Sequence, residues 1–230
     1  MTPSSPRAQQ HATRAAFFIP GFATAAWAPM VPFAKAKAGL SDASLGGLLL
    51  CLGLGSLLAM PLAGALTARL GSRRLMIATT ALILLALPLL TLAPTPLALG
   101  ATLFVFGAGV GAMDCTMNMQ AVAVERDAGR PMMSGFHAFY SIGGFVGAGC
   151  MTGLLVLGTP LWLASLIAVA AMLLVALLSA PHWRPQRILH DGPMLAVPHG
   201  VVLFISVLAF VVFLAEGSML DWSAVFLAEV

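Results

Sequence analysis

No charged side chain occurs between Arg74 and Asp114, and leucine, alanine and glycine make up most of this interval. A helix needs about 20 apolar residues to cross the hydrocarbon core of a bilayer, so the interval is long enough to cross almost twice. The prolines of Thr91–Pro96 divide it, because proline interrupts the hydrogen bonding of a helix. We therefore predict one membrane span over Leu75–Leu92 and another over Leu97–Val124.

Five other segments have the length and the apolar character of membrane spans: Ala15–Ala34, Leu45–Leu66, Met132–Leu157, Leu161–Ala180 and Gly200–Leu220. Across the chain only 8% of the residues are charged, against about 25% in soluble domains. The sequence therefore predicts an all-α polytopic membrane protein with seven spanning helices.

The predicted spans form two groups on either side of a polar segment. Residues 1–14 are expected to be an N-terminal tail in the cytoplasm, and residues 15–180 a bundle of six helices. Residues 181–199 are expected to be a central cytoplasmic loop. Residues 200–230 would then contribute the first helix of a second bundle, which we expect to be truncated here.

Basic residues lie almost entirely at one end of the predicted bundle. Of the 11 lysines and arginines, only Lys35 and Lys37 fall at the opposite end. Loops that stay in the cytoplasm carry an excess of basic residues. We therefore expect a multi-pass protein of the bacterial inner membrane with its N-terminus in the cytoplasm. This orientation disfavours a seven-helix receptor, whose N-terminus lies outside.

Polar side chains share one face of the fourth span. Gly107, Gly111, Asp114 and Asn118 are spaced i, i+4, i+7 and i+11, which places them in one stripe of a helix. Glycines let a neighbouring helix approach closely in lipid, so we expect the stripe to face protein. A charge at the centre of a membrane helix costs roughly 2.5–3.5 kcal/mol, and a buried carboxylate lowers that cost by holding a proton. Asp114 is therefore a candidate proton carrier.

The alternative for Asp114 is a solvated acid near the end of its helix, paired with Arg126 or Arg130. His137, on a stripe of the fifth span, is placed either to share a proton with Asp114 or to join two helices by a hydrogen bond.

Two further residues are candidates for a polar cavity. Glu216 lies well inside the last span, where it is placed to contact a solute. Trp27 is flanked by three prolines, Pro20, Pro29 and Pro32. It either lines a cavity, as broken helices of transporters do, or packs in the core beside the proline kinks.

Motifs for several other functions are missing. There is no H-E-x-x-H metal motif, and the glycines of Gly107–Gly111 lack the preceding strand of a nucleotide-binding loop. No basic patch with interleaved aromatic residues suggests nucleic acid. We therefore expect no enzyme activity, no cofactor, no metal site and no nucleic-acid partner.

The turn between the second and third predicted spans reads GALTARLGSRRL, Gly64–Leu75. It resembles the loop signature of the major facilitator superfamily, with matches at Gly64, Leu66, Arg69, Gly71, Arg73 and Arg74. The resemblance implies that this turn helps to lock the two halves of a transporter on the cytoplasmic side. The aspartate of the signature falls on Ala68, which removes an acidic group from the implied gate.

Two longer segments, Gly107–Gly144 and Ala215–Trp222, resemble the fucose–proton symporter-like branch of that family. The resemblance implies that polar residues of helices four and five face a central cavity, namely Asp114, Asn118, His137 and Tyr140. It also assigns Glu216 to the acidic position of helix seven. A full member has about twelve helices, so the chain is similar to the first half plus one helix.

Together these features predict a secondary transporter that couples a small polar solute to protons, the solute being sugar-like by resemblance alone. Asp114 and His137 would handle the proton, while the solute would contact Trp27, Asn118, Tyr140 and Glu216. Such a transporter works in a lipid bilayer and needs the missing C-terminal helices in cis or in trans. One alternative is a truncated or split membrane subunit without transport activity of its own.

A less favoured alternative is an exporter of drugs or metabolites, because the Gly-Pro motif of drug–proton antiporters is absent from the fifth span. The Asp114 carboxylate is chemically compatible with a sodium ion as well as with a proton as the coupling ion.

Overall fold

The computed structural model describes residues 5–187 and 197–229 of the chain. Within these ranges every regular element is a helix. Seven segments are long and apolar enough to cross a membrane, which confirms the predicted all-α fold with seven spans.

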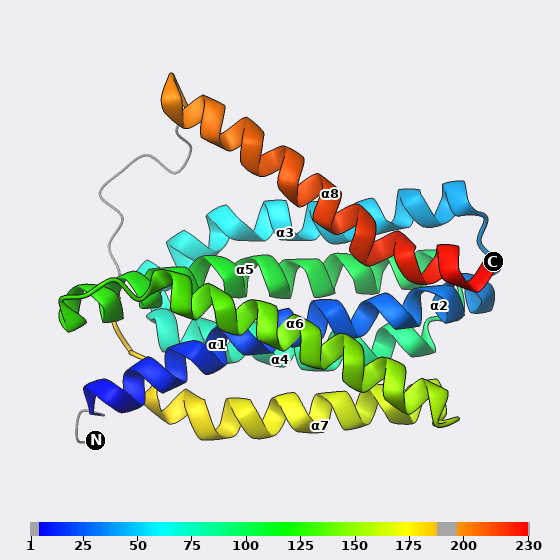
Figure 1. Cartoon of the computed structure of the whole chain (residues 1–230), viewed down its shortest axis with the longest axis horizontal. Helices are drawn as coiled ribbons and strands as arrows, with labels where there is room; N and C mark the ends of the chain where they lie inside the picture. Colours follow the sequence, from blue (N-terminus) through cyan, green and yellow to red (C-terminus); the bar gives the residue numbers. More distant parts are fainter. Residues whose placement is uncertain (1–4, 188–196, 230) are drawn as a thin grey trace.

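The first span consists of three consecutive elements, α1 (Pro6–Trp27), η1 (Ala28–Met30) and α2 (Val31–Ala38). The next five spans are α3 (Asp42–Leu70), α4 (Ser72–Leu92), α5 (Pro96–Ala128), α6 (Met133–Val156) and α7 (Leu161–Ser179), which the short η2 (Ala180–His182) extends. The last span is α8 (Val201–Glu229). Figure 1 shows α1 to α7 running along the long axis as one bundle, with α8 lying obliquely across it.

The helix α1 begins at Pro6, well before the predicted start of the first span at Ala15. The Ser5 side chain accepts a hydrogen bond from the backbone N–H of Ala8 at 3.3 Å, which caps the helix. Proline suits the first helical position because it needs no hydrogen bond there. Ala12 and Thr13 are buried, so these additional turns pack against the bundle.

Two pairs of helices approach each other closely through glycines. In the first pair, α3 packs on α5, where a methyl group added at Gly107 would overlap the backbone of Leu52. A methyl group at Gly111 would likewise overlap Ser56, and one at Gly55 would overlap the carbonyl of Phe104. The two glycines of the predicted stripe therefore contact a neighbouring helix, as expected from their spacing.

In the second pair, α1 packs on α6 in the same manner. Added methyl groups would overlap the backbone of Phe18 at Gly143, of Phe22 at Gly147, and of Tyr140 at Gly21. The core lies around these contacts and includes Phe17, Phe106 and Phe136, all fully buried.

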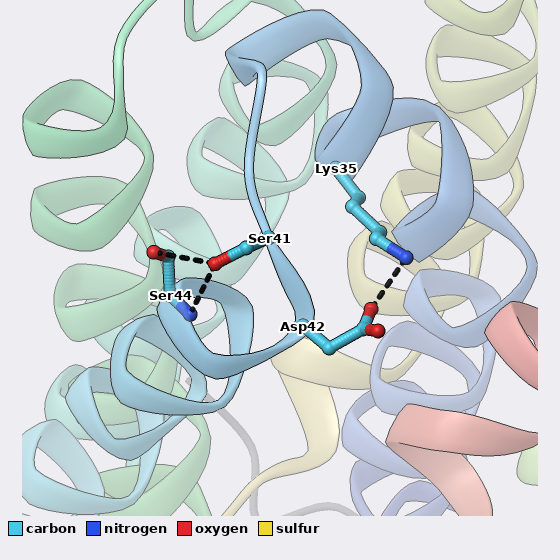
Figure 2. A network of polar contacts seen from close by, with 4 residues as sticks. All are labelled: Lys35, Ser41, Asp42 and Ser44. Atoms are coloured by element: carbon cyan, nitrogen blue, oxygen red, sulfur yellow. Dashed lines mark hydrogen bonds and ion pairs between the residues drawn. The ribbon is translucent and has the colours of Figure 1, made fainter.

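Polar contacts hold α2 to its neighbours at the end of the bundle that contains the lysines. The ammonium group of Lys35 lies 2.5 Å from the carboxylate of Asp42, an ion pair that Figure 2 shows. The Ser41 side chain caps α3 by accepting a hydrogen bond from the Ser44 N–H at 3.2 Å. Lys37 donates to the carbonyl of Thr91 at 2.8 Å, which joins α2 to the end of α4.

The helix α8 contacts the bundle only near its C-terminal end. Its side chains are almost all exposed from Val201 to Glu216, whereas residues 220–225 are partly or fully buried. Most of its contacts are with η1 and α2, and the Trp222 ring also lies against Gly46 of α3. In Figure 1 the start of α8 lies far from the other helices and its end lies beside α2.

The start of α6 is capped by an acid from the preceding helix. The Glu125 carboxylate accepts hydrogen bonds from the N–H groups of Met132 at 2.6 Å and Met133 at 2.7 Å. A negative charge at this position also interacts favourably with the helix dipole. Glu125 therefore joins the end of α5 to the start of α6.

We predict that Glu125→Ala lowers the free energy of unfolding by about 1 kcal/mol, the typical cost of losing an N-terminal cap. The measurement is a dodecyl sulfate titration of the purified protein, followed by circular dichroism. Arg126→Ala is the control, since Arg126 is exposed and is the next residue in the chain. Equal losses in the two variants would show that the cap contributes nothing of its own.

Candidate functional site

The polar stripe of α5 continues beyond the glycines as a hydrogen-bonded pair. The Asn118 amide donates to the backbone carbonyl of Asp114 at 2.9 Å and to its carboxylate at 3.4 Å. Both side chains are partly buried. The spacing of four residues therefore places the two groups together, as one turn of helix requires.

Asp114 lies deep within α5, which has 33 residues. At about 1.5 Å per residue, Asp114 is roughly 21 Å from the end of the helix at Ala128. It is also roughly 27 Å from the start of the helix at Pro96, so it lies close to the middle of α5. Arg126 lies about 18 Å further along the axis, and no ion pair joins Asp114 to Arg126 or Arg130 among the described residues. The geometry therefore disfavours the interpretation of Asp114 as an acid at the helix end.

Two residues of α6 lie within electrostatic range of Asp114, namely His137 and Tyr140. The His137 ring contacts the ring of Phe17 edge-on, with centroids 5.0 Å apart, and its side chain is otherwise exposed. The Tyr140 hydroxyl lies 3.5 Å from the hydroxyl of Thr24 on α1. The structure thus brings Asp114, Asn118, His137 and Tyr140 to one region between α5 and α6.

Thr24 is a neighbour of this cluster that the sequence analysis did not identify. Its hydroxyl donates to the carbonyl of Pro20 at 2.8 Å and reaches Tyr140 from the same turn. The sequence feature that points to Thr24 is its position three residues after Gly21, because Gly21 lets the backbone of Tyr140 approach α1 closely. Threonine in an apolar helix commonly bonds to its own backbone, so the residue type alone gives no functional signal.

Glu216 joins the cluster from α8. It lies within electrostatic range of Tyr140 and lines a groove of about 1140 Å³ between α8, η1, α2 and α6. Of the described residues that line this groove, Thr152 and Ser223 are the others with a hydroxyl or a charge, and the rest are apolar. A polar solute with an apolar face would find both kinds of surface here.

Trp27 does not belong to this cluster. Its side chain is 1% exposed and packs in the core, which agrees with the packing alternative for this residue. Its indole N–H has no hydrogen-bond partner among the described residues. A tight core beside the proline-containing η1 accounts for this placement, so the geometry gives no support to the predicted contact of Trp27 with a solute.

The predicted gate residues lie around the sharp turn between α3 and α4. Gly71 has φ +84°, and a Cβ atom there would lie 2.7 Å from the carbonyl oxygen of Pro185. Glycine is therefore required twice, by the backbone angle and by the close approach. Arg69 and Arg74 are exposed, while Gly64 and Arg73 are partly buried.

This turn is fastened to the segment that follows α7. Ser72 and Arg73 donate backbone hydrogen bonds to the carbonyls of Gln186 at 2.9 Å and Arg184 at 3.1 Å. The Ser72 hydroxyl also donates to the Arg184 carbonyl at 2.6 Å. The first residues of the predicted central loop are therefore part of the folded bundle.

The same segment is held by α1 and α5. The buried Gln120 donates to Thr13 at 3.0 Å and accepts from the Arg184 N–H at 3.0 Å. The Trp183 indole donates to the carbonyl of Ala12 at 3.0 Å, and the Arg184 guanidinium forms an ion pair with Asp127. This polar network lies at the arginine-rich end of the bundle, away from the cluster around Asp114.

Comparison with known proteins assigns the family. The model of the Major Facilitator Superfamily matches residues 15–230 of the chain. The chain belongs to this superfamily. Proteins of the superfamily are transporters and are generally not enzymes, which agrees with the expected absence of catalysis.

Three curated relatives illustrate what this chain resembles. It is 54% identical to an uncharacterized MFS-type transporter of Yersinia pestis over 95% of the chain and 57% of that protein. It is 35% identical to an uncharacterized transporter of Sinorhizobium fredii, over 94% and 58%. It is 34% identical to the membrane protein MosC of Rhizobium meliloti, over 93% and 53%.

The chain thus spans a little more than half the length of these curated relatives. No solved structure matches it. The names of the relatives specify neither a solute nor a coupling ion, so the family is established while the fucose–proton symporter-like branch stays a prediction.

Proposed function

We propose that the chain is the N-terminal part of a transporter that moves a small polar solute together with protons by alternating access. The observation that carries this proposal is the cluster of Asp114, Asn118, His137 and Tyr140 in two membrane-length helices, with Asp114 roughly 21 Å from the end of α5. Polar groups at such a depth are costly in lipid and mark pathways for solutes and ions.

In this proposal Asp114 is the proton carrier. Its carboxylate is only partly buried, so its surroundings change when the cavity opens to water or closes. Protonation removes the charge when the site is dry, and water favours its release. His137 lies within electrostatic range of Asp114, and an imidazole ring can both accept and donate a proton through its two nitrogens. The pair is thereby suited to exchange a proton during each transport cycle.

The proposed solute contacts are Asn118, Tyr140 and Glu216. An amide, a phenol and a carboxylate together offer donors and acceptors suited to the hydroxyl groups of a sugar-like solute. The groove beside Glu216 adds apolar surface for the less polar face of such a solute. The sugar itself rests on the resemblance to the fucose–proton symporter-like branch.

Alternating access also needs a second bundle, which we propose is supplied by further helices in cis or in trans. Secondary transporters bind their substrates between two units that rock against each other. The helix α8, whose buried residues lie near its C-terminal end, is suited to belong to the second unit. The proposed orientation, with the arginine-rich end in the cytoplasm, follows from the distribution of basic residues.

The direct test is transport by the complete protein, reconstituted into proteoliposomes without a prior proton gradient. We predict that adding a transported probe sugar, with L-fucose as the first candidate, raises the external pH because protons enter with the solute. A protonophore should abolish accumulation against a solute gradient. Accumulation that depends on sodium, with no change of external pH, would refute proton coupling and leave the transporter assignment in place.

A further inference from the structure

A second cavity lies at the arginine-rich end, between the start of α4 and the segment after α7. It has a volume of about 430 Å³ and is lined by Leu70, Arg73, Arg74, Ile77, Pro185 and Arg187. It is separate from the cluster around Asp114. Arg73 and Arg74 belong to the predicted gate, but neither that prediction nor the transport proposal assigns a ligand to the cavity.

Among the described residues, three guanidinium groups and no acid line the cavity. No aspartate or glutamate occurs between Asp42 and Asp114, so the turn itself supplies no negative charge. Within the described ranges, Arg184 is the neighbouring arginine that has an acidic partner, Asp127. Three positive groups around one cavity attract an anion, and the planar donors of arginine suit phosphate oxygens in particular.

The cavity is fixed before any ligand arrives. The segment that leads to Arg187 is bonded to the turn through Ser72 and Arg73, whose N–H groups donate to the carbonyls of Gln186 and Arg184. The positive φ of Gly71 lets Pro185 approach the turn closely. Arginines from two distant parts of the sequence are thereby held together, which lowers the entropic cost of binding an anion between them.

One side of the cavity is apolar and faces outward. Leu70 ends α3 and is 43% exposed, and Ile77 lies in α4 and is 44% exposed. Both helices are of membrane-spanning length, so the cavity lies where a spanning helix leaves the hydrocarbon. Basic pockets at this level between membrane helices are suited to lipid head groups.

We propose that Arg73, Arg74 and Arg187 form a binding site for a phosphate group, supplied by an anionic phospholipid. The phosphate would contact the guanidinium groups, and the parts of the acyl chains nearest the head group would contact Leu70 and Ile77. Inorganic phosphate offers the same charged group without the acyl chains, so it is the competing source.

The test compares binding of dioleoyl phosphatidylglycerol, dioleoyl phosphatidylcholine and inorganic phosphate to the purified protein in detergent, by native mass spectrometry and thermal shift. The variant is Arg74→Gln with Arg187→Gln, two exposed positions at which folding should be unaffected. We expect weaker binding of phosphatidylglycerol by about 5-fold for each charge lost, or roughly 25-fold together. Phosphatidylcholine binding should not change.

The matched control is Arg126→Gln with Arg130→Gln, which removes the same charge from exposed residues outside the cavity. Its lipid binding should equal that of the unchanged protein. Loss of inorganic phosphate binding in the cavity variant alone, with no effect on the lipid, would keep the phosphate site and assign it to a soluble ligand. Equal losses in both double variants, or none in either, would overturn the proposal.

Discussion

Asp114→Asn should reduce the rate of proton-driven solute uptake by roughly 100-fold or more. This is the lower end of the rate effect that a positioned proton-transferring side chain typically has. Asparagine has nearly the same size as aspartate. Its side-chain oxygen can accept the hydrogen bond that the Asn118 amide donates to the Asp114 carboxylate at 3.4 Å. The bundle should therefore fold normally, and the change removes little besides the group that binds the proton. Uptake into proteoliposomes of the complete protein, measured from pH 5 to pH 8, would show both the loss and its pH dependence.

Two further measurements make this prediction specific. Exchange of labelled for unlabelled solute without a proton gradient should continue in the variant, because exchange needs no net release of protons. Asp221→Asn is the control, since Asp221 is also a partly buried acid in a membrane-length helix. The role of Asp114 as proton carrier is wrong if its variant keeps both the rate of uptake and the pH dependence.

Gly55→Ala and Gly107→Ala should each lower the free energy of unfolding by about 1–3 kcal/mol, the usual cost of overpacking a filled interior. The added methyl groups would overlap backbone atoms of Phe104 and Leu52, and a backbone cannot rotate away as a side chain can. The helices α3 and α5 would have to separate. A dodecyl sulfate titration followed by tryptophan fluorescence would measure the loss.

The chain supplies a close control for this prediction. Gly53 lies two residues before Gly55 on α3, and a methyl group there meets nothing within 4 Å. Gly53→Ala should therefore stabilise the helix by up to about 1 kcal/mol, because alanine is the better helix former. If Gly53→Ala and Gly55→Ala shift the stability alike, close approach of α3 to α5 is not the cause.

The spans could be predicted because burial in lipid imposes long apolar segments with few charges. The stripe of Gly107, Gly111, Asp114 and Asn118 could be predicted for a similar reason, since helical spacing fixes which residues share a face. The start of α1 at Pro6 could not, because Arg7 and His11 lower the local hydropathy while the packing of Ala12 and Thr13 keeps the segment helical.

The candidate site was predictable in part. Single-helix spacing and the resemblance nominated Asp114, Asn118, His137 and Tyr140, which the structure brings together. The burial of Trp27 and the contact of Thr24 with Tyr140 depend on how α1 rotates against α6, and spacing within one helix carries no information about that rotation. The network of Gln120 and Trp183 depends on contacts between residues far apart in the chain, for the same reason.

The glycine-lined contacts also bear on how the chain is made. Each joins one of the first three spans to one of the next three: α3 meets α5, and α1 meets α6. When the ribosome has released only α1, α3 and α4, neither α1 nor α3 has the helix that fits its closest-packing face. The bundle can be completed only after α6 has entered the membrane, so Gly143 and Gly147, late in the sequence, decide when the earliest helix becomes locked in place. A ribosome stalled before α5 would therefore leave three inserted helices in lipid that remain loosely associated and open to membrane proteases.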